Sequence, residues 1–268
     1  MLLNFSNDSS QPYTPATAAG VVFSSAGSVA NFFEEESRGA VQVTGDVYGW
    51  YTIPSTNANC AWGTWQSDAV AAAQAAGVSF STYTNIVFAW PHTSSCGWAG
   101  LGYMPGNYTY NNGALGLRVI AHELSHNFGI NHASSLSCTS GGVRVAVSSS
   151  CTYSEYGDPF TVMGGGSTFH NDGEQVGEMG WLASSEVRTV VPGASYLVQP
   201  LLGTAAGTVK VLRVPRADGT SFFIDVRVPY GPSFDRWGVS DPAVTGVMVR
   251  VSPGTAARTS SPRNTKLV

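Results

Sequence analysis

Charged residues are scarce in this chain of 268 residues, at 11% of the sequence, against roughly 25% in typical soluble domains. Lysine is nearly absent, since Lys210 and Lys266 are the only two. The formal net charge is -4, and no basic stripe is available to neutralise phosphates, so we expect no nucleic-acid partner. Small polar residues replace the missing charges, which favours an extracellular protein.

Long apolar runs are also missing, because the run at residues 69–78 is short and is interrupted by Gln74. A membrane-spanning helix needs about 20 apolar residues, so we expect no membrane insertion. Residues 1–10 do not contain a basic segment followed by a long apolar stretch, and they are not a signal peptide. We expect a secreted protein whose signal and any pro-segment are absent from this chain.

The length and a change of pattern after Trp181 predict two domains. Residues 1–192 mix helix-like and strand-like segments and would form the first domain. Residues 193–268 would form a β-rich C-terminal domain, truncated at its end, with no ionisable cluster suited to catalysis. Its expected strands are residues 195–198, 209–214, 222–228 and 247–251. This region could be a separate sandwich that binds a polymer or the cell surface, or it could simply cover the catalytic domain; we favour the structural role.

In the first domain, apolar periodicity predicts alternating strands and helices. A helix is expected at residues 29–38, where Ser28 would be the N-cap and Gly39 would end the helix. Its acidic triplet, residues 34–36, is interpreted as a solvated stretch without chemistry. The other expected elements are strands at 2–5 and 85–90, two strands or a hairpin at 40–44 and 47–53, a helix at 65–76 and an edge strand at 98–104.

The strongest chemical signal is the string HELSHNFGINH, which begins in a helix predicted for residues 113–128. His122 and His126 are four residues apart, so both imidazoles lie on one helical face and one zinc ion can bridge them. Gly129 can take the left-handed conformation that ends the helix and turns the chain back. His132 then becomes the third ligand, and Glu123 remains free for chemistry.

Three protein ligands leave one coordination position open for water, as in catalytic zinc sites. Glu123 would take a proton from the zinc-bound water during attack on a peptide carbonyl, and would then protonate the leaving amine. The alternatives are a zinc site that only holds the fold, or histidines that merely cap and pack. An exopeptidase would also need a charged clamp for a chain terminus, and the sequence offers no arginine or acidic cluster for that purpose.

The four cysteines, which lack any CxxC pair, are interpreted as two disulfides. Three pairings are possible, and we favour Cys60 with Cys96 and Cys138 with Cys151. The second pair would staple a loop between two active-site segments. The alternative is four buried free thiols.

The string from His122 to His132 matches the metzincin signature, HExxHxxGxxH, and metzincins also carry a methionine turn below the zinc. Met163, in DPFTVMGGG, resembles this turn; the alternative is an ordinary core methionine. The position two residues after it, a tyrosine ligand in some metzincins, is Gly165 here.

The wider chain resembles the gametolysin-like peptidases at VTGDVYGWYTIP (43–54), GWAGLGYMPG (97–106), YGDPFTVMG (156–164) and GEMGWL (177–182). The resemblance implies a metzincin α/β catalytic domain, with a mixed twisted sheet and an active-site helix, followed by a β-rich region. It also implies a secreted zinc metalloendopeptidase that acts on extracellular or cell-wall proteins. We expect a monomer with one catalytic zinc ion; no motif supports calcium.

Several residues are candidates for support of the site. Asp158 would order the methionine turn or accept the second N–H of a ligand histidine, or else form an Asx turn beside Pro159. The segment Gly100, Leu101, Gly102 and Tyr103 resembles the edge strand that binds substrate as an extra strand. Possible stabilisers of the oxyanion are Tyr103, Tyr156 and His170.

Two functions of different class follow from these patterns. The first is an active secreted endopeptidase, which requires Glu123 beside the three histidines. The second is a metal-stabilised adhesion or binding protein that uses a protease fold without turnover.

Overall fold

The computed structural model describes residues 1–166, 168–205, 207–229, 234–252 and 264–268. The chain forms two compact units that are interleaved in sequence. The first contains Met1–Phe33 and Gln42–Gly129, and the second contains Glu34–Val41 and Ile130–Val268. The expected division into residues 1–192 and 193–268 does not coincide with these units.

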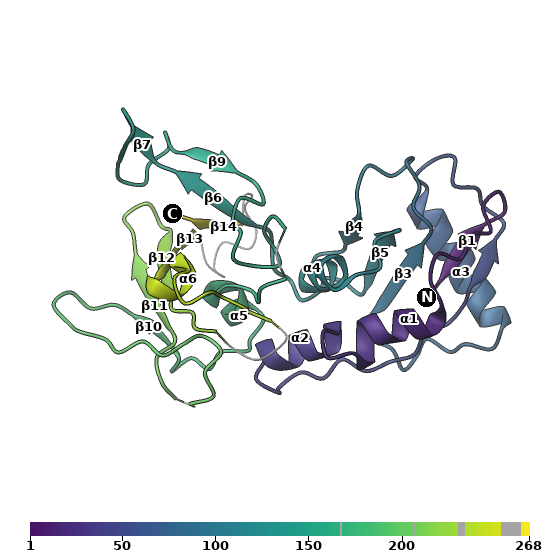
Figure 1. Ribbon diagram of the computed structural model, residues 1–268, viewed down its shortest axis with the longest axis horizontal. Coiled ribbons are helices and arrows are strands. Elements are labelled where there is room, and N and C mark those ends of the chain that lie inside the picture. Colours follow the sequence, from purple (N-terminus) through teal and green to yellow (C-terminus); the bar gives the residue numbers. More distant parts are fainter. Residues whose placement is uncertain (167, 206, 230–233, 253–263) are drawn as a thin grey trace. The chain divides into compact units, whose positions relative to one another are not determined.

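The first unit is built from the short strands and helices that Figure 1 shows, and these pack around an aromatic core. Its elements are β1 (Leu3–Phe5), α1 (Pro15–Ala19), a π-helical turn (Gly20–Ser24), α2 (Val29–Glu36), β2 (Tyr51–Ile53), α3 (Trp62–Ala75), β3 (Ile86–Trp90), β4 (Gly100–Gly102), β5 (Tyr108–Asn112) and α4 (Leu117–Asn127). The last turn of α2 belongs to the second unit.

Three of these strands form one sheet in the order β3-β5-β4. β3 and β5 are parallel, whereas β4 is antiparallel to β5 and forms the edge. α3 buries Trp65, Ala69 and Ala73, which recur every four residues on one helical face. Trp65 packs 4.7 Å from the ring of Phe5 and 5.2 Å from the ring of Trp90. This aromatic core supports the sheet that carries β4.

Two expectations for this unit were wrong. Residues 40–44 and 47–53 do not form two strands or a hairpin, because Tyr51–Ile53 is the one strand there and its partner is β1, in parallel. β5 was not expected, since its end is polar. Asn112 is nevertheless buried, because its side chain donates hydrogen bonds to the carbonyls of Thr93 (3.0 Å), Cys96 (3.2 Å) and Trp98 (3.0 Å).

Within the described residues, one helical stretch, Pro15–Glu36, is long and apolar enough in composition to cross a membrane. We had expected no such run. The stretch is interrupted at residues 25–28, and helices of protein cores and signal sequences meet the same criterion. One such stretch is weak evidence for a membrane span.

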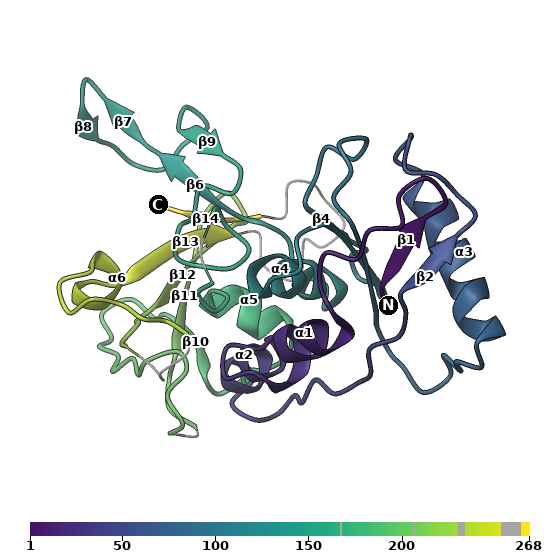
Figure 2. The same cartoon turned by 45° about the vertical axis from the view of Figure 1, so that its right-hand side comes forward.

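The second unit is dominated by a seven-stranded sheet in the order β10-β11-β12-β13-β14-β6-β9 (Figure 2). Its elements are β6 (Ala133–Ser137), β7 (Thr139–Ser140), β8 (Val143–Arg144), β9 (Thr152–Ser154), α5 (Gly173–Glu178), β10 (Val187–Thr189), β11 (Val211–Pro215), β12 (Ser221–Asp225), α6 (Pro242–Thr245), β13 (Met248–Ser252) and β14 (Thr265–Leu267).

Three of the four expected C-terminal strands correspond to β11, β12 and β13, whereas residues 195–198 form no strand. β14 pairs in parallel with β6, and β6 pairs with β9. The sheet therefore joins strands from both sides of residue 192.

Both expected disulfides are confirmed, Cys60–Cys96 in the first unit and Cys138–Cys151 in the second. The second bond closes the loop between β6 and β9.

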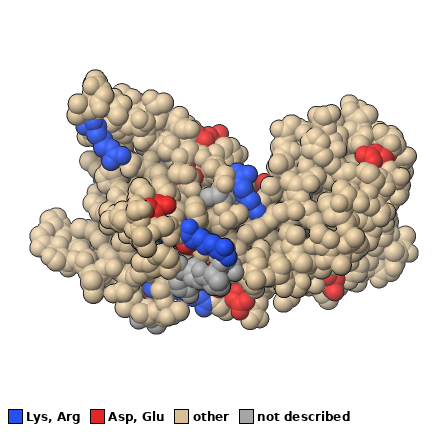
Figure 3. Space-filling view, viewed as in Figure 1, with Lys and Arg blue, Asp and Glu red and all other residues tan. Residues whose placement is uncertain are grey.

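Figure 3 shows few charged side chains on the visible face, in keeping with the composition.

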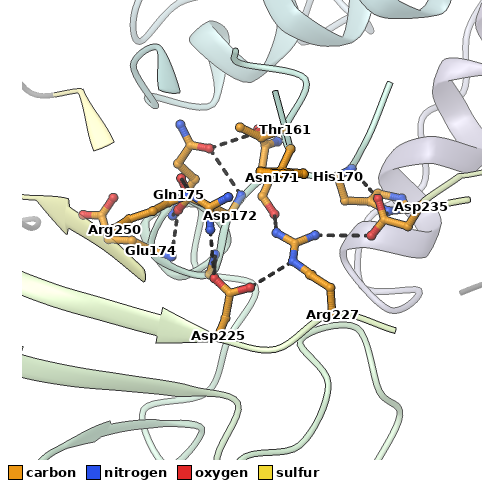
Figure 4. Close-up of polar contacts among 12 residues, drawn as sticks. Thr161, His170, Asn171, Asp172, Glu174, Gln175, Asp225, Arg227, Asp235 and Arg250 are labelled. Atoms are coloured by element: carbon orange, nitrogen blue, oxygen red, sulfur yellow. Dashed lines mark hydrogen bonds and ion pairs between the residues drawn. The ribbon is translucent and has the colours of Figure 1, made fainter. Parts of the chain in front are cut away.

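Several of the charged side chains are buried inside the second unit (Figure 4). Arg250, on β13, lies 2.7 Å from Asp158, 3.2 Å from Asp225 and 3.5 Å from Asp172. Arg227 joins Asp225 (2.9 Å) to Asp235. Buried charges of this kind are tolerated when they are paired and hydrogen-bonded, so the cluster depends on each of its members.

The interpretation of residues 34–36 as a solvated stretch was wrong for Glu36, which is fully buried. Its carboxylate accepts hydrogen bonds from the backbone and side-chain N–H groups of Asn171. The signal was present in the sequence, because Glu36 lies seven residues after Val29 and continues the helical face that Val29 and Phe32 bury.

The buried Glu36 predicts a pH-dependent stability. Burial raises the pKa of this carboxyl from 4.5 to about 7, aided by Asp235 and opposed by His170 and Asn171. Between these pH values the folded chain keeps a proton that the unfolded chain has released, so the free energy of unfolding falls as the pH rises. The loss is up to about 3 kcal/mol.

Urea unfolding between pH 4.5 and 7.5 tests this expectation. Glu36→Gln should gain stability relative to the wild type as the pH rises, whereas Glu34→Gln, at an exposed position two residues earlier, should follow the wild type. Parallel curves for all three proteins would contradict the assignment to Glu36.

Candidate metal centre

Two of the three expected ligands lie on α4. This helix is buried over much of its length, and Ile120, Ala121 and Leu124 are its buried apolar residues. His122 and His126 are one turn apart, and their ring centroids are separated by 4.9 Å. The helix is one turn shorter at its start than expected, and it ends before Gly129, which has φ 98°. The left-handed Gly129 is thus confirmed.

The third histidine follows six residues after His126 along the chain. His122, His126 and His132 each offer a ring nitrogen, and these atoms all lie within 4.8 Å of one another. Three imidazole nitrogens at such distances form a donor set that suits zinc.

Glu155 and Tyr156 flank His132 within the second unit. The Nδ1 atom of His132 lies 2.7 Å from Oε1 of Glu155, and its ring centroid lies 4.1 Å from that of Tyr156. The pairing of β6 with β9, with Ser135 opposite Ser154, brings these residues together. Because Nδ1 has a carboxylate partner, Nε2 is the nitrogen that remains for a metal.

Met163 is fully buried beside the segment that carries His132. Its carbonyl accepts a hydrogen bond from the backbone N–H of Ala133 (2.9 Å), and Thr161 and Gly164 close a tight turn around it (3.0 Å). A side chain at Gly164 would collide with the Asp158 carbonyl. The turn therefore lies directly against the residue after His132.

Asp158 forms the Asx turn that was the alternative to its expected roles at the methionine turn and the ligand histidine. Its Oδ1 accepts a hydrogen bond from the N–H of Phe160 (2.8 Å), and its Oδ2 accepts one from Arg250 (2.7 Å). The carboxylate at hydrogen-bond distance from His132 is Glu155. Asp158 orders the chain ahead of Met163.

Glu123 is buried next to β4. A Cβ atom on Gly100 would lie 2.4 Å from Oε1 of Glu123, and one on Gly102 would lie 2.5 Å from its carbonyl oxygen. The two glycines thus allow β4 to approach α4 closely. Burial raises the pKa of Glu123 to about 8, and a nearby divalent cation would oppose this shift.

β4 is held at its end by a side chain of α4 that we had not expected. Asn127 donates hydrogen bonds to the carbonyls of Tyr103 (2.8 Å) and Tyr108 (3.1 Å), and Asn85 donates one to Asn127 (3.0 Å). The contact fixes the edge strand to the helix that carries His122 and His126. Asn127 directly follows the predicted ligand His126 in the sequence, and this adjacency could have identified it as a residue that supports the site.

Of the expected oxyanion stabilisers, His170 is excluded by burial. It is fully buried, and its Nδ1 lies 3.3 Å from Asp235 in the charged cluster of the second unit. Tyr103 and Tyr156 are exposed, at 40% and 42%. Tyr103 lies immediately after β4, and the ring of Tyr156 packs at a tilt against that of His132.

The comparisons with known proteins agree with this geometry. No curated protein matches the chain. The family model described as gametolysin peptidase M11 matches residues 18–231, most of the chain, and the region includes both segments that carry the histidines and Met163. The mixed sheets and few helices are compatible with a zincin-like α/β fold. The chain therefore belongs to the gametolysin family of metallopeptidases, peptidase M11.

Proposed function

We propose that this protein is a secreted zinc endopeptidase of metzincin type that cleaves extracellular or cell-wall proteins. The observation that carries the proposal is the group of three histidine nitrogens within 4.8 Å of one another, with Glu123 following His122 on the same helix. The two disulfides are compatible with secretion.

The zinc ligands would be His122, His126 and His132. When bound, the ion supplies a Lewis acid that polarises the substrate carbonyl and makes a water molecule more acidic. Glu123 takes the proton of the attacking water on its carboxylate and returns it to the leaving amine. Glu155 holds the imidazole of His132 through Nδ1 and so directs Nε2 inward. Met163 supports this segment through the hydrogen bond that its carbonyl accepts from Ala133.

Substrate binding would use the free edge of β4. On the β5 side, the carbonyl of Ala99 and the N–H of Tyr103 are bonded to β5 (2.9 and 3.2 Å). The alternation of a strand then turns the backbone groups of Gly100 and Gly102 toward the open edge. A peptide can pair there as an additional strand beside Glu123. Such pairing binds the middle of a chain, which favours an endopeptidase.

A binding protein without turnover is the alternative, and one experiment separates the two. The zinc-loaded protein is incubated with a complex peptide library, and the products are identified by mass spectrometry. Internal cuts that disappear with a chelator support the endopeptidase. Folded, zinc-loaded protein that makes no cuts would contradict it.

The contact of Glu155 with His132 predicts an effect on metal affinity. Replacement by alanine should weaken zinc binding by about 10- to 100-fold, because the imidazole loses the group that fixes its orientation. Competition with a fluorescent chelator measures this change. Glu34→Ala, at an exposed position of α2, is the matched control, and equal affinity of Glu155→Ala and wild type would remove Glu155 from the site.

A further inference from the structure

A cluster of aromatic side chains lies beside the edge strand of the first unit. The ring of Tyr103 is 5.8 Å from Trp62, 6.0 Å from Tyr110 and 6.4 Å from Tyr108. Trp62 is also 5.1 Å from Tyr110. Tyr110 is fully buried, whereas Tyr103 is 40% exposed and Trp62 is half-buried. The cluster therefore has a buried base and an exposed pair of rings, Trp62 and Tyr103.

The exposed pair lies on the face of the strand that points away from Glu123. A Cβ atom on Gly100 or Gly102 would meet residues of α4. Because side chains alternate along a strand, Leu101 points to the opposite face, where it packs against the aromatic core. Tyr103 follows on this same face.

The side chains of a peptide paired with β4 would also alternate between the two faces of the sheet. Every second side chain would project to the aromatic face, and the one level with Tyr103 would come within about 5 Å of it, as cross-strand neighbours do. Tyr103 is three residues from Gly100, which lies against Glu123, a distance of about 10 Å along a strand. The contacted substrate residue is thus two to four positions from the scissile bond.

This surface is uncharged and rich in aromatic residues. Residues 61–66 and 97–110, which form it, contain no Asp, Glu, Lys or Arg. The Cys60–Cys96 disulfide ties the start of α3 to the segment that leads into β4. Trp62 is therefore held beside β4 by a covalent bond, and the surface needs little ordering when it binds a ligand.

We propose that Trp62 and Tyr103 form a substrate-specificity site that selects an aromatic side chain two to four residues from the cleaved bond. This inference rests on the proposed peptidase function. An aromatic residue would complete the ring cluster with edge-to-face contacts, whereas a charged residue would lose hydration without gaining a partner.

A peptide series tests the proposal. One position at a time, two to four residues on either side of a common cleaved bond, carries Phe, Ala or Asp. The wild type should prefer Phe over Asp at one position by at least about tenfold. Each ring contact contributes about threefold, so Trp62→Leu with Tyr103→Ala should reduce this preference by about tenfold, chiefly through KM.

The controls separate the inference from the proposed function. The preference is taken as the ratio of Phe to Asp cleavage within each variant, so that a general change in activity cancels, and Tyr196→Ala, a half-buried tyrosine of the second unit, should keep the Phe preference. A wild type that cleaves no peptide contradicts the peptidase itself. A wild type that cleaves without a Phe preference, or a preference that survives the double substitution, overturns the specificity site alone.

Discussion

Replacing Glu123 with glutamine should lower kcat/KM by roughly 10³-fold or more, while zinc binding and folding are retained. The amide is close in size to the carboxylate, but it cannot take the proton of the attacking water or return it to the leaving amine. The carboxylate is also well placed, since it lies on α4 next to His122 and against Gly100 of β4, the proposed substrate edge. Steady-state kinetics on a peptide that the wild type cleaves measure the effect.

Zinc content by mass spectrometry must accompany these rates, because loss of the ion would abolish activity for a different reason. Glu34→Gln is the matched control, an exposed glutamate of α2, and should be as active as the wild type. Retained activity in Glu123→Gln would mean that another group carries the proton.

Replacing Arg250 with alanine should destabilise the second unit by about 3 to 5 kcal/mol. The substitution removes the cation that Asp158, Asp172 and Asp225 share within 3.5 Å. Asp158 and Asp172 then remain buried without this charge partner, whereas Asp225 keeps Arg227. The cost of an uncompensated buried charge exceeds what the ion pair contributes. Urea unfolding of the metal-free protein at pH 7 gives the difference.

Two further variants make this test specific. Arg188→Ala removes an exposed arginine from β10 of the same sheet and should change stability by less than about 0.5 kcal/mol. Arg250→Lys keeps the charge but lacks the planar fork, so an intermediate loss is expected. A loss for Arg250→Ala no larger than that for Arg188→Ala would show that the cluster is not charge-dependent.

The sequence predicted the histidine motif well because its information is local. The spacing of His122 and His126 follows from helix geometry, and Gly129 carries its own backbone preference. The role of Glu155 could not be read in this way. It depends on the register between β6 and β9, which are separated by a loop, and neither strand has a distinctive pattern.

The burial of charge was missed for a different reason. Asp225 and Arg250 lie in β12 and β13, and Arg227 follows two residues after the end of β12. A β-like sequence pattern does not reveal that opposite charges meet in the interior. The burial of Glu36 could have been predicted from helical periodicity. We interpreted it as solvent-exposed only because its two neighbours are also acidic.

The pairing of β14 with β6 limits which fragments of the protein can be expressed in soluble form. A fragment that stops at residue 192 would retain β6 and β9 but lose β11 to β14. The backbone groups of β6 that β14 satisfies would then become an open edge, ready to pair with a neighbouring copy. We expect such a fragment to aggregate, so that shortening the gene at this point would yield insoluble material instead of a minimal enzyme.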